Sequence, residues 1–340
     1  DPAQDDVPAD YFNTVLYTAT GTDNLAITGV GFQPDFTWIK SRSAAYAHNV
    51  YDNVRGVSKR LQTNLTNAES SPVSGVKSFD ADGFTLGADT NDTNFTAGIT
   101  YVAWNWLAGN GTSSNTDGTI TSTVSANQKA GFSIVTYTGN GSGGQVDSVG
   151  HGLSQAPEIY FTKSRDTAQE WFTFSNATGS WQYAFLNSTA AFASTGQYAD
   201  ATELYLSGTS TNNSGDDFIA YCFHSVEGYS KFGSYTGNGS TDGPFVYTGF
   251  RPAFVMIKVV NLAGGHWTIH DSERDAFNES QKWLFPSSSF AEQTATYSKL
   301  DLLSNGFKIK SAGGDNVNYS GYQFIYMAFA EMPFKYSNAR

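Results

Sequence analysis

The chain contains little charge, a single cysteine and no long hydrophobic run. Charged residues make up 15% of its 340 residues, and the formal net charge is −12. This acidic balance argues against a nucleic-acid partner, because binding to phosphates requires a basic surface. Cys222 lies in the apolar segment "FIAYCFH" and has no partner for an intrachain disulfide, so we expect it to be a small core residue. No apolar segment reaches the roughly 18 residues that a membrane-spanning helix needs, so no membrane insertion is expected.

Aromatic residues and turn formers are abundant. Phe, Trp and Tyr make up 15% of the residues, and there are 34 glycines. Short β-branched and aromatic runs alternate with turns that contain Gly, Asn and Pro, as in "FSIVTYTG", "APEIYFTK" and "DFIAYCF". Such runs indicate strands separated by tight turns. The sequence therefore predicts an all-β protein, with at most one short helical turn in each of residues 53–64 and 272–285.

An internal repeat organises the chain. The hexapeptides "TYTGNG" (136–141) and "SYTGNG" (234–239) are nearly identical, and "LYTATG" (16–21) is a more distant version. Each is followed by an apolar run that leads from a proline to a lysine; the pairs are Pro34 and Lys40, Pro157 and Lys163, and Pro252 and Lys258. Each copy ends with a loop rich in Asn, Asp, Gly and Ser and a final apolar strand. The repeat of roughly 100 residues matches a self-contained domain rather than a solenoid repeat.

The repeat divides the chain into five segments and predicts three tandem β-sandwich domains of jelly-roll or lectin-like type. The segments are an N-terminal arm (1–10), a first sandwich (11–108), a polar linker (109–131), a second sandwich (132–230) and a third sandwich with a C-terminal tail (231–340). Loops of a sandwich gather at its two ends, so the polar loops before the three final strands are expected at equivalent tips.

Those tips, with the aromatic residues placed in loops, are the predicted binding surface. Aromatic rings stack on the C–H face of a sugar while neighbouring amides bond to its hydroxyl groups. The candidate ligand-binding residues are Asn91, Asn94, Trp181, Tyr183, Asn212, Asn213, Asp315, Asn318 and Tyr319.

No catalytic residue and no metal site are predicted. A calcium ion could be bound at Asp80 and Asp82 in "DADG", although turn chemistry explains these residues as well and the terminal Glu of an EF-hand loop is missing. Asp271 and Glu273 could be proposed as a glycosidase pair, but their adjacency in sequence implies no partner geometry. The matching pairs Asp52/Arg55 and Asp271/Arg274 are instead expected to form salt bridges that tie a turn.

The segments "GFQPDFTWIKSR", "SFDADGFTLG", "EGYSKFGSYTGNG" and "YMAFAEMPFKYSNAR", taken together, resemble tail-fibre or virion structural proteins of tailed phages, especially marine ones. The resemblance spans nearly the whole chain. It implies a virion component on the outer surface or the tail, with other virion proteins as partners. It supplies no catalytic or ligand-binding residue.

The preferred hypothesis is therefore a non-enzymatic virion protein that attaches to host-surface glycan through its loops and needs no cofactor. A polysaccharide-degrading tail enzyme and a secreted bacterial adhesin or lectin are the alternatives. A homo-oligomer is possible, but the sequence points to no interface.

Overall fold

The computed structural model describes residues 7–88, 93–141, 147–294, 298–312 and 316–331. In these residues the regular structure is almost entirely β, which confirms the all-β prediction. The exceptions are a 3-10 helix, η1 (Pro8–Asp10), and one short helix, α1 (Gly208–Asn212), in a polar loop. Residues 53–64 and 272–285 form turns and the short strands β5 and β23.

The strands fall into three groups that follow the internal repeat. We call these groups the first, second and third units. The first unit contains β1 (Phe12–Thr18), β2 (Leu25–Thr28), β3 (Phe36–Ser41), β4 (Asn49–Asp52), β5 (Leu61–Gln62), β6 (Val76–Asp80), β7 (Gly83–Leu86) and β8 (Thr100–Trp106). The second unit contains β11 (Phe132–Thr138), β12 (Ser148–Gly150), β13 (Ile159–Ser164), β14 (Phe172–Ser175), β15 (Gln182–Phe185), β16 (Ala193–Ser194), β17 (Glu203–Tyr205) and β18 (Asp217–Phe223). The third unit contains β19 (Ser230–Thr236), β20 (Phe245–Tyr247), β21 (Pro252–Val259), β22 (Thr268–Asp271), β23 (Lys282–Trp283), β24 (Gln293–Thr294), β25 (Leu300–Leu303), β26 (Gly306–Ile309) and β27 (Gln323–Ala330).

The three units share one sheet topology. Each has a large antiparallel sheet in which the last strand pairs with the first and the third; the orders are β1-β8-β3-β4, β11-β18-β13-β14 and β19-β27-β21-β22. Each also has a small sheet, with the orders β2-β7-β6, β12-β17 and β20-β26-β25. The repeat seen in the sequence is thus a repeat of strand pairing.

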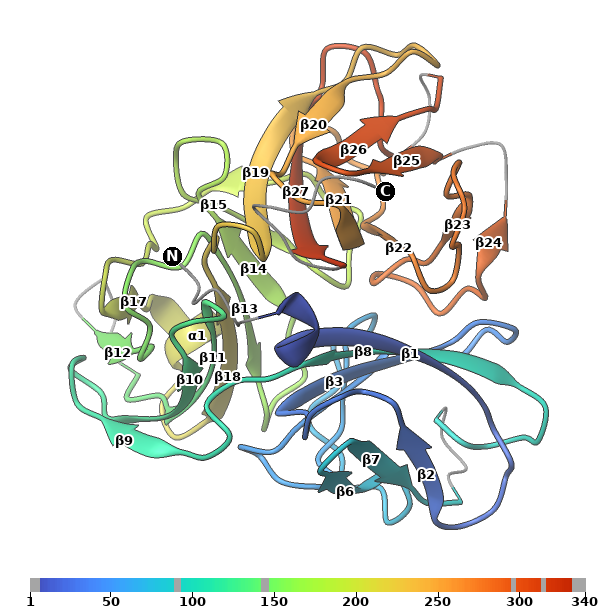
Figure 1. Cartoon of the computed structure of the whole chain (residues 1–340). Coiled ribbons are helices and arrows are strands. Elements are labelled where there is room, and N and C mark those ends of the chain that lie inside the picture. Colours follow the sequence, from blue (N-terminus) through green and yellow to red (C-terminus); the bar gives the residue numbers. More distant parts are fainter. Residues whose placement is uncertain (1–6, 89–92, 142–146, 295–297, 313–315, 332–340) are drawn as a thin grey trace.

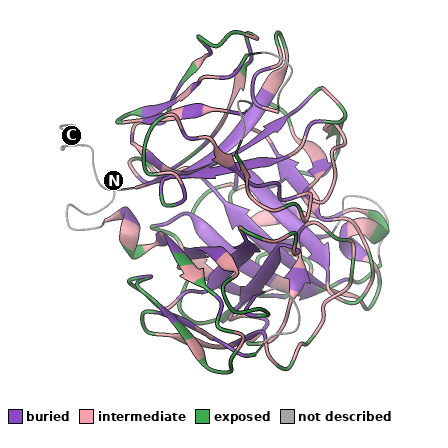
Figure 2. Cartoon of the chain, turned by 90° about the vertical axis from the view of Figure 1, so that its right-hand side faces the viewer, coloured by how far each residue is buried: buried purple, intermediate pink, exposed green. Residues whose placement is uncertain are grey.

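The units surround a common core. Figure 1 shows three lobes, blue, green-yellow and orange-red, whose large sheets converge on the centre, and Figure 2 shows buried strands at that centre and exposed loops outside. Each unit has its own hydrophobic cluster, and a fourth cluster combines residues of all three, among them Trp106, Phe223 and Phe329. Because this core is shared, the boundaries of the three domains stay a prediction.

Each apolar run after a proline forms a strand that is covered on both faces of its sheet. All six residues of β3 are buried, with Trp38 in the central cluster and Ile39 in the cluster of the first unit. Strands covered on both faces read as continuous rather than alternating hydrophobic runs. The repeated lysine lies near the end of this buried run, and the residue after it (Ser41, Ser164 or Val259) is buried as well. The ammonium groups of Lys163 and Lys258 are enclosed and donate to loop carbonyls, and burial lowers the pKa of each to about 8.

The polar segment 109–131 contains two strands, where the sequence analysis expected a connector. β9 (Ser113–Asn115) pairs with β10 (Ser122–Asn127), and β10 pairs with β11, so the segment widens the large sheet of the second unit. Val124 is buried in the cluster of that unit. The Ser- and Thr-rich composition resembles that of a connector. Threonine and valine nevertheless favour strands, even in a polar segment.

Candidate functional site

The predicted loop asparagines Asn94, Asn212 and Asn318 occupy one equivalent position in the three units. All three are fully buried. Each side-chain oxygen accepts a backbone N–H from the loop after the first strand of its unit, at 2.9 Å from Thr20, 3.0 Å from Asn140 and 2.9 Å from Asn238. Each side chain thus fastens two loops of one tip together.

The amide nitrogens of these residues are also used inside the tips. Asn94 donates to the carbonyls of Thr22 and Gly87, at 2.8 and 3.0 Å. Asn318 donates to the carbonyls of Ser240 and Ser311, at 2.8 and 2.6 Å. These groups hold the tip together and are not directed at solvent.

The remaining loop candidates differ in position. Asn91 and Asp315 lie outside the described residues. Asn213 and Tyr319 are half-buried. Tyr319 meets Tyr322 edge to face, with ring centroids 5.9 Å apart.

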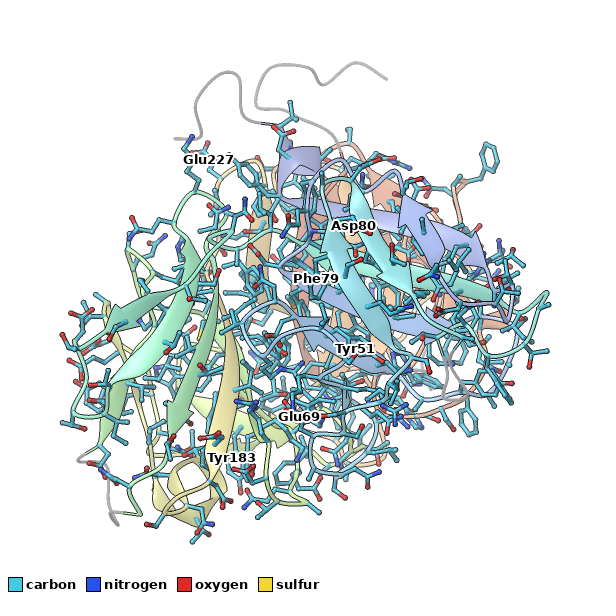
Figure 3. The ribbon with its side chains drawn as sticks, turned by 90° about the horizontal axis from the view of Figure 1, so that it is seen from below. Tyr51, Glu69, Phe79, Asp80, Tyr183 and Glu227 are labelled. Carbon is cyan, nitrogen blue, oxygen red and sulfur yellow. The ribbon has the colours of Figure 1, made fainter. Side chains whose placement is uncertain are left out.

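The two aspartates of the possible calcium site accept hydrogen bonds that stabilise turns. Asp82 accepts the backbone N–H groups of Gly29 and Gly31 at 3.0 and 2.6 Å, and these bonds lower the pKa of its carboxyl. Asp80, which is labelled in Figure 3, accepts the hydroxyl of Thr85 at 2.7 Å. In the described residues no three His, Cys, Asp or Glu side chains gather as metal ligands would.

Trp181 and Tyr183 belong to an aromatic surface on the outer hairpin of the second unit. We call Phe172, Trp181, Tyr183 and Phe185 the aromatic ledge; all four are half-buried. The Tyr183 ring lies 5.9 Å from that of Phe172 and 5.7 Å from that of Phe185. Trp181 packs on the buried Tyr160 at 5.7 Å. Tyr183 is labelled in Figure 3.

The ledge is rigid and open. Phe172 faces Phe185 across the β14–β15 pair, so two strands fix its rings. In the described part of the chain, the indole N–H of Trp181 and the hydroxyl of Tyr183 have no hydrogen-bond partner. A ring face with a free polar group at its margin can stack on an apolar face and bond beside it.

The other units lack this ledge. Strand register places Arg60 and Gln62 of the first unit where the second has Tyr183 and Phe185. In the third unit Trp283 and Phe285 fill these places, and both are buried. The sequence marked Trp181 and Tyr183, but it gave no sign that Phe172 and Phe185 flank them, because both occur in ordinary strand runs.

A second concavity lies beside the segment 109–131. This open groove of about 600 Å³ runs between β9, β10 and the loop around Gly152. Asn115, Asp117 and Gln128 supply its polar groups, and Val124, Ala126 and Leu153 its apolar floor. Sequence reasoning missed it because the strands that form it were not expected.

Two of the three contacts between units contain a buried ion cluster. Between the first and second units, Glu69 pairs with Arg55 and with Arg165, at 2.9 Å each (Glu69 is labelled in Figure 3). Arg55 also pairs with Asp52 at 2.5 Å, and the Tyr221 hydroxyl donates to Asp52 at 2.6 Å. Burial tends to raise the pKa of Glu69, but the hydrogen bond from Arg165 and the charge of Arg55 outweigh it, and the pKa lies below its usual value.

The contact between the third and first units repeats this design. Glu292 pairs with Arg42 at 2.9 Å and with Arg274 at 3.3 Å. Arg274 pairs with Asp271 at 2.5 Å, and the indole N–H of Trp104 donates to Asp271 at 3.0 Å. The predicted bridges Asp52/Arg55 and Asp271/Arg274 are thus confirmed. The glycosidase pair fits poorly, because Asp271 is buried and bonded whereas Glu273 is exposed.

In the described residues the contact between the second and third units contains no ion pair, and Phe192 packs against Trp267 there, with ring centroids 6.0 Å apart. Phe192 donates its backbone N–H to the Val260 carbonyl at 2.8 Å, as Glu69 does to Arg165 at 2.7 Å. Strand register places Ser175 where the other units have their aspartate. The second unit thus has no aspartate at this contact, in agreement with the absence of the Asp–Arg motif from the second copy of the repeat.

The geometry defines an all-β protein of three topologically equivalent units closed around one core. The chain belongs to the family described as "Domain of unknown function (DUF7483)", whose model matches residues 7–333. No curated protein and no solved structure matches the chain. Among the described residues, no helix is long and apolar enough to cross a membrane.

Proposed function

We propose that the chain is a non-enzymatic structural protein of a tailed-phage virion, placed on the outer surface or the tail, and that its aromatic ledge binds host-surface glycan. The phage assignment rests on the resemblance of the sequence segments described above. The glycan assignment rests on one observation: the four half-buried rings of the ledge lie on one hairpin, where the Trp181 indole N–H and the Tyr183 hydroxyl have no hydrogen-bond partner among the described residues.

The ledge suits a sugar because the two parts of a sugar surface need different partners. Its C–H faces stack on aromatic rings, and its hydroxyl groups bond to polar groups beside them. The chain has seven tryptophans, and the six others are buried, so Trp181 alone is positioned to report on binding at the surface.

Tryptophan fluorescence tests the ledge directly. Soluble maltohexaose, cellohexaose and purified surface polysaccharide from candidate hosts are titrated into the protein while acrylamide quenching is measured. A bound sugar should shield Trp181 from acrylamide, and Trp181→Ala should abolish the response. Tyr183→Ala should weaken binding, whereas Tyr319→Ala, at the tip of the third unit, should not. Binding that is equal in all these variants would place the glycan site elsewhere.

Two further measurements separate this function from its alternatives. Release of reducing ends from host polysaccharide would favour a tail enzyme. Detection of the chain in purified phage particles, by mass spectrometry and antibody labelling in electron micrographs, would favour a virion protein over a secreted adhesin. Absence from particles would refute the virion assignment.

A further inference from the structure

The outer strand of the small sheet in the third unit, β20, carries two exposed aromatic residues. Phe245 is 46% exposed and Tyr247 65%, whereas Val246 between them is buried. Both rings therefore lie on the outer face of the sheet. Gly306 lies opposite Tyr247 on β26, and a Cβ added to it would come within 3.1 Å of the Phe245 ring, so that ring lies over the glycine.

The backbone of β20 is open along its outer edge. The carbonyl of Pro244 accepts from Ile309, and the N–H of Thr248 donates to Asn305, at 3.0 and 3.1 Å. Backbone groups of an antiparallel strand point alternately to its two sides, so those of Phe245 and Tyr247 point away from β26. In the described residues these groups have no partner on that side.

The second unit shows what the equivalent edge can bind. Strand pairing matches β12 to β20, with Ser148 and Gly150 in the places of Phe245 and Tyr247. There the edge is occupied by residues 119–122 of the chain itself. Ile120 forms a parallel bridge with Val149, and its N–H donates to the carbonyl of Ser148 at 3.0 Å.

The same segment also covers the outer face of β12. The hydroxyl of Ser122 donates to the carbonyl of Gly150 at 2.7 Å. The side chain of Asn115, on β9, lies over Gly150, since a Cβ added to Gly150 would come 1.6 Å from its oxygen. The third unit has large aromatic rings at these positions, and their exposure shows that no segment of the described residues covers them.

We propose that the outer edge of β20 binds an extended, uncharged segment of a partner polypeptide, which adds to the small sheet as a parallel strand and packs against Phe245 and Tyr247. The internal precedent favours a polypeptide over a sugar, because the equivalent edge already accepts a backbone N–H from such a segment. Addition of a strand to an open sheet edge obtains affinity from backbone hydrogen bonds and specificity from side-chain contacts.

A peptide copying residues 118–123, GTITST, tests the proposal on the full chain. Its binding is measured by fluorescence anisotropy, with amide hydrogen exchange of β20 as a second readout. Tyr247→Ala removes the ring, and Tyr247→Pro removes the ring and the outward N–H. Proline is tolerated at a sheet edge where its nitrogen faces away from the ladder. We expect Tyr247→Pro to weaken binding at least roughly tenfold more than Tyr247→Ala does.

Thr28→Pro makes the equivalent change in the first unit and is the matched control, which should leave binding unchanged. A peptide with Ile120→Pro should fail to bind the unaltered protein, and this arm does not depend on how any protein variant folds. Trp181→Ala should leave peptide binding intact, which separates this surface from the glycan ledge. Absence of peptide binding at millimolar concentration, equal losses in Tyr247→Ala and Tyr247→Pro, or protection of Tyr247 by maltohexaose instead of the peptide would each overturn the proposal.

Discussion

Single amides hold the tips of the units. The buried Asn212 accepts the backbone N–H of Asn140 at 3.0 Å and donates to the Asn140 side-chain oxygen and to Asp147, at 2.9 and 3.0 Å. Replacing it with alanine removes these bonds from a buried position, so Asn212→Ala should lower the free energy of unfolding by about 1–3 kcal/mol. Asn213→Ala, at the half-buried neighbour, should cost less than about 0.5 kcal/mol. Urea denaturation of both variants checks the difference, and equal losses would contradict it.

The same asparagines show the limit of residue-level prediction. The sequence identified the polar tips because Asn and Gly mark turns. It could not show that Asn94, Asn212 and Asn318 point inward, because their partners lie far away in the chain: Thr20, Asn140 and Asn238. Trp181 and Tyr183 were found because aromatic residues beside polar loop residues are candidates for exposure.

At the scale of the element, the charged turn after β4 joins two units. Arg55→Met should destabilise the protein by about 3–5 kcal/mol, because it leaves Asp52 buried without its cation. The double variant Asp52→Ser/Arg55→Thr carries the residues that the second unit has at these places, Ser175 and Thr178, and should recover part of the loss. Chemical denaturation of the single and double variants measures the coupling; a double variant less stable than Arg55→Met would contradict this account.

The Asp–Arg bridges were predictable because the motif recurs at matching positions in two copies. The glutamates that also pair with these arginines, Glu69 and Glu292, were not predictable. They meet Arg165 and Arg42 only when the units pack against one another. The pairing of β9 and β10 was missed for a related reason: a polar strand is stabilised by the edge of β11, which a local pattern does not contain.

For the whole molecule, the shared core predicts cooperative unfolding. Phe12, Trp106, Phe223 and Phe329 belong to one cluster drawn from all three units. A single unit would expose its share of this cluster, so an isolated segment 132–230 should not form a stable monomer, whereas the whole chain should unfold in one transition. Calorimetry of both checks this; a stable isolated segment, or three separate transitions, would contradict it.

Acid should also destabilise the whole chain. Burial, with a smaller effect of Arg274, lowers the pKa of His270 to about 3, and burial lowers that of His48 well below its usual value. Below pH 6.5 these two histidines bind protons in the unfolded chain but stay neutral in the folded chain. The free energy of unfolding therefore falls as the pH decreases, by up to about 1.4 kcal/mol per pH unit for each histidine.

Thermal melts between pH 7.5 and pH 5 measure this slope. The second unit has Phe174 at the place of His270. His270→Phe should therefore fold and reduce the pH dependence. An unchanged slope would show that His270 does not contribute.

The closed arrangement also brings the first and last strands of the whole fold together. The rings of Phe12 on β1 and Phe329 on β27 stack with centroids 5.1 Å apart. A body whose first and last strands touch can be grafted into a surface loop of a carrier protein without stretching either connection. It can equally be circularly permuted, with new ends opened in the polar segment between β9 and β10.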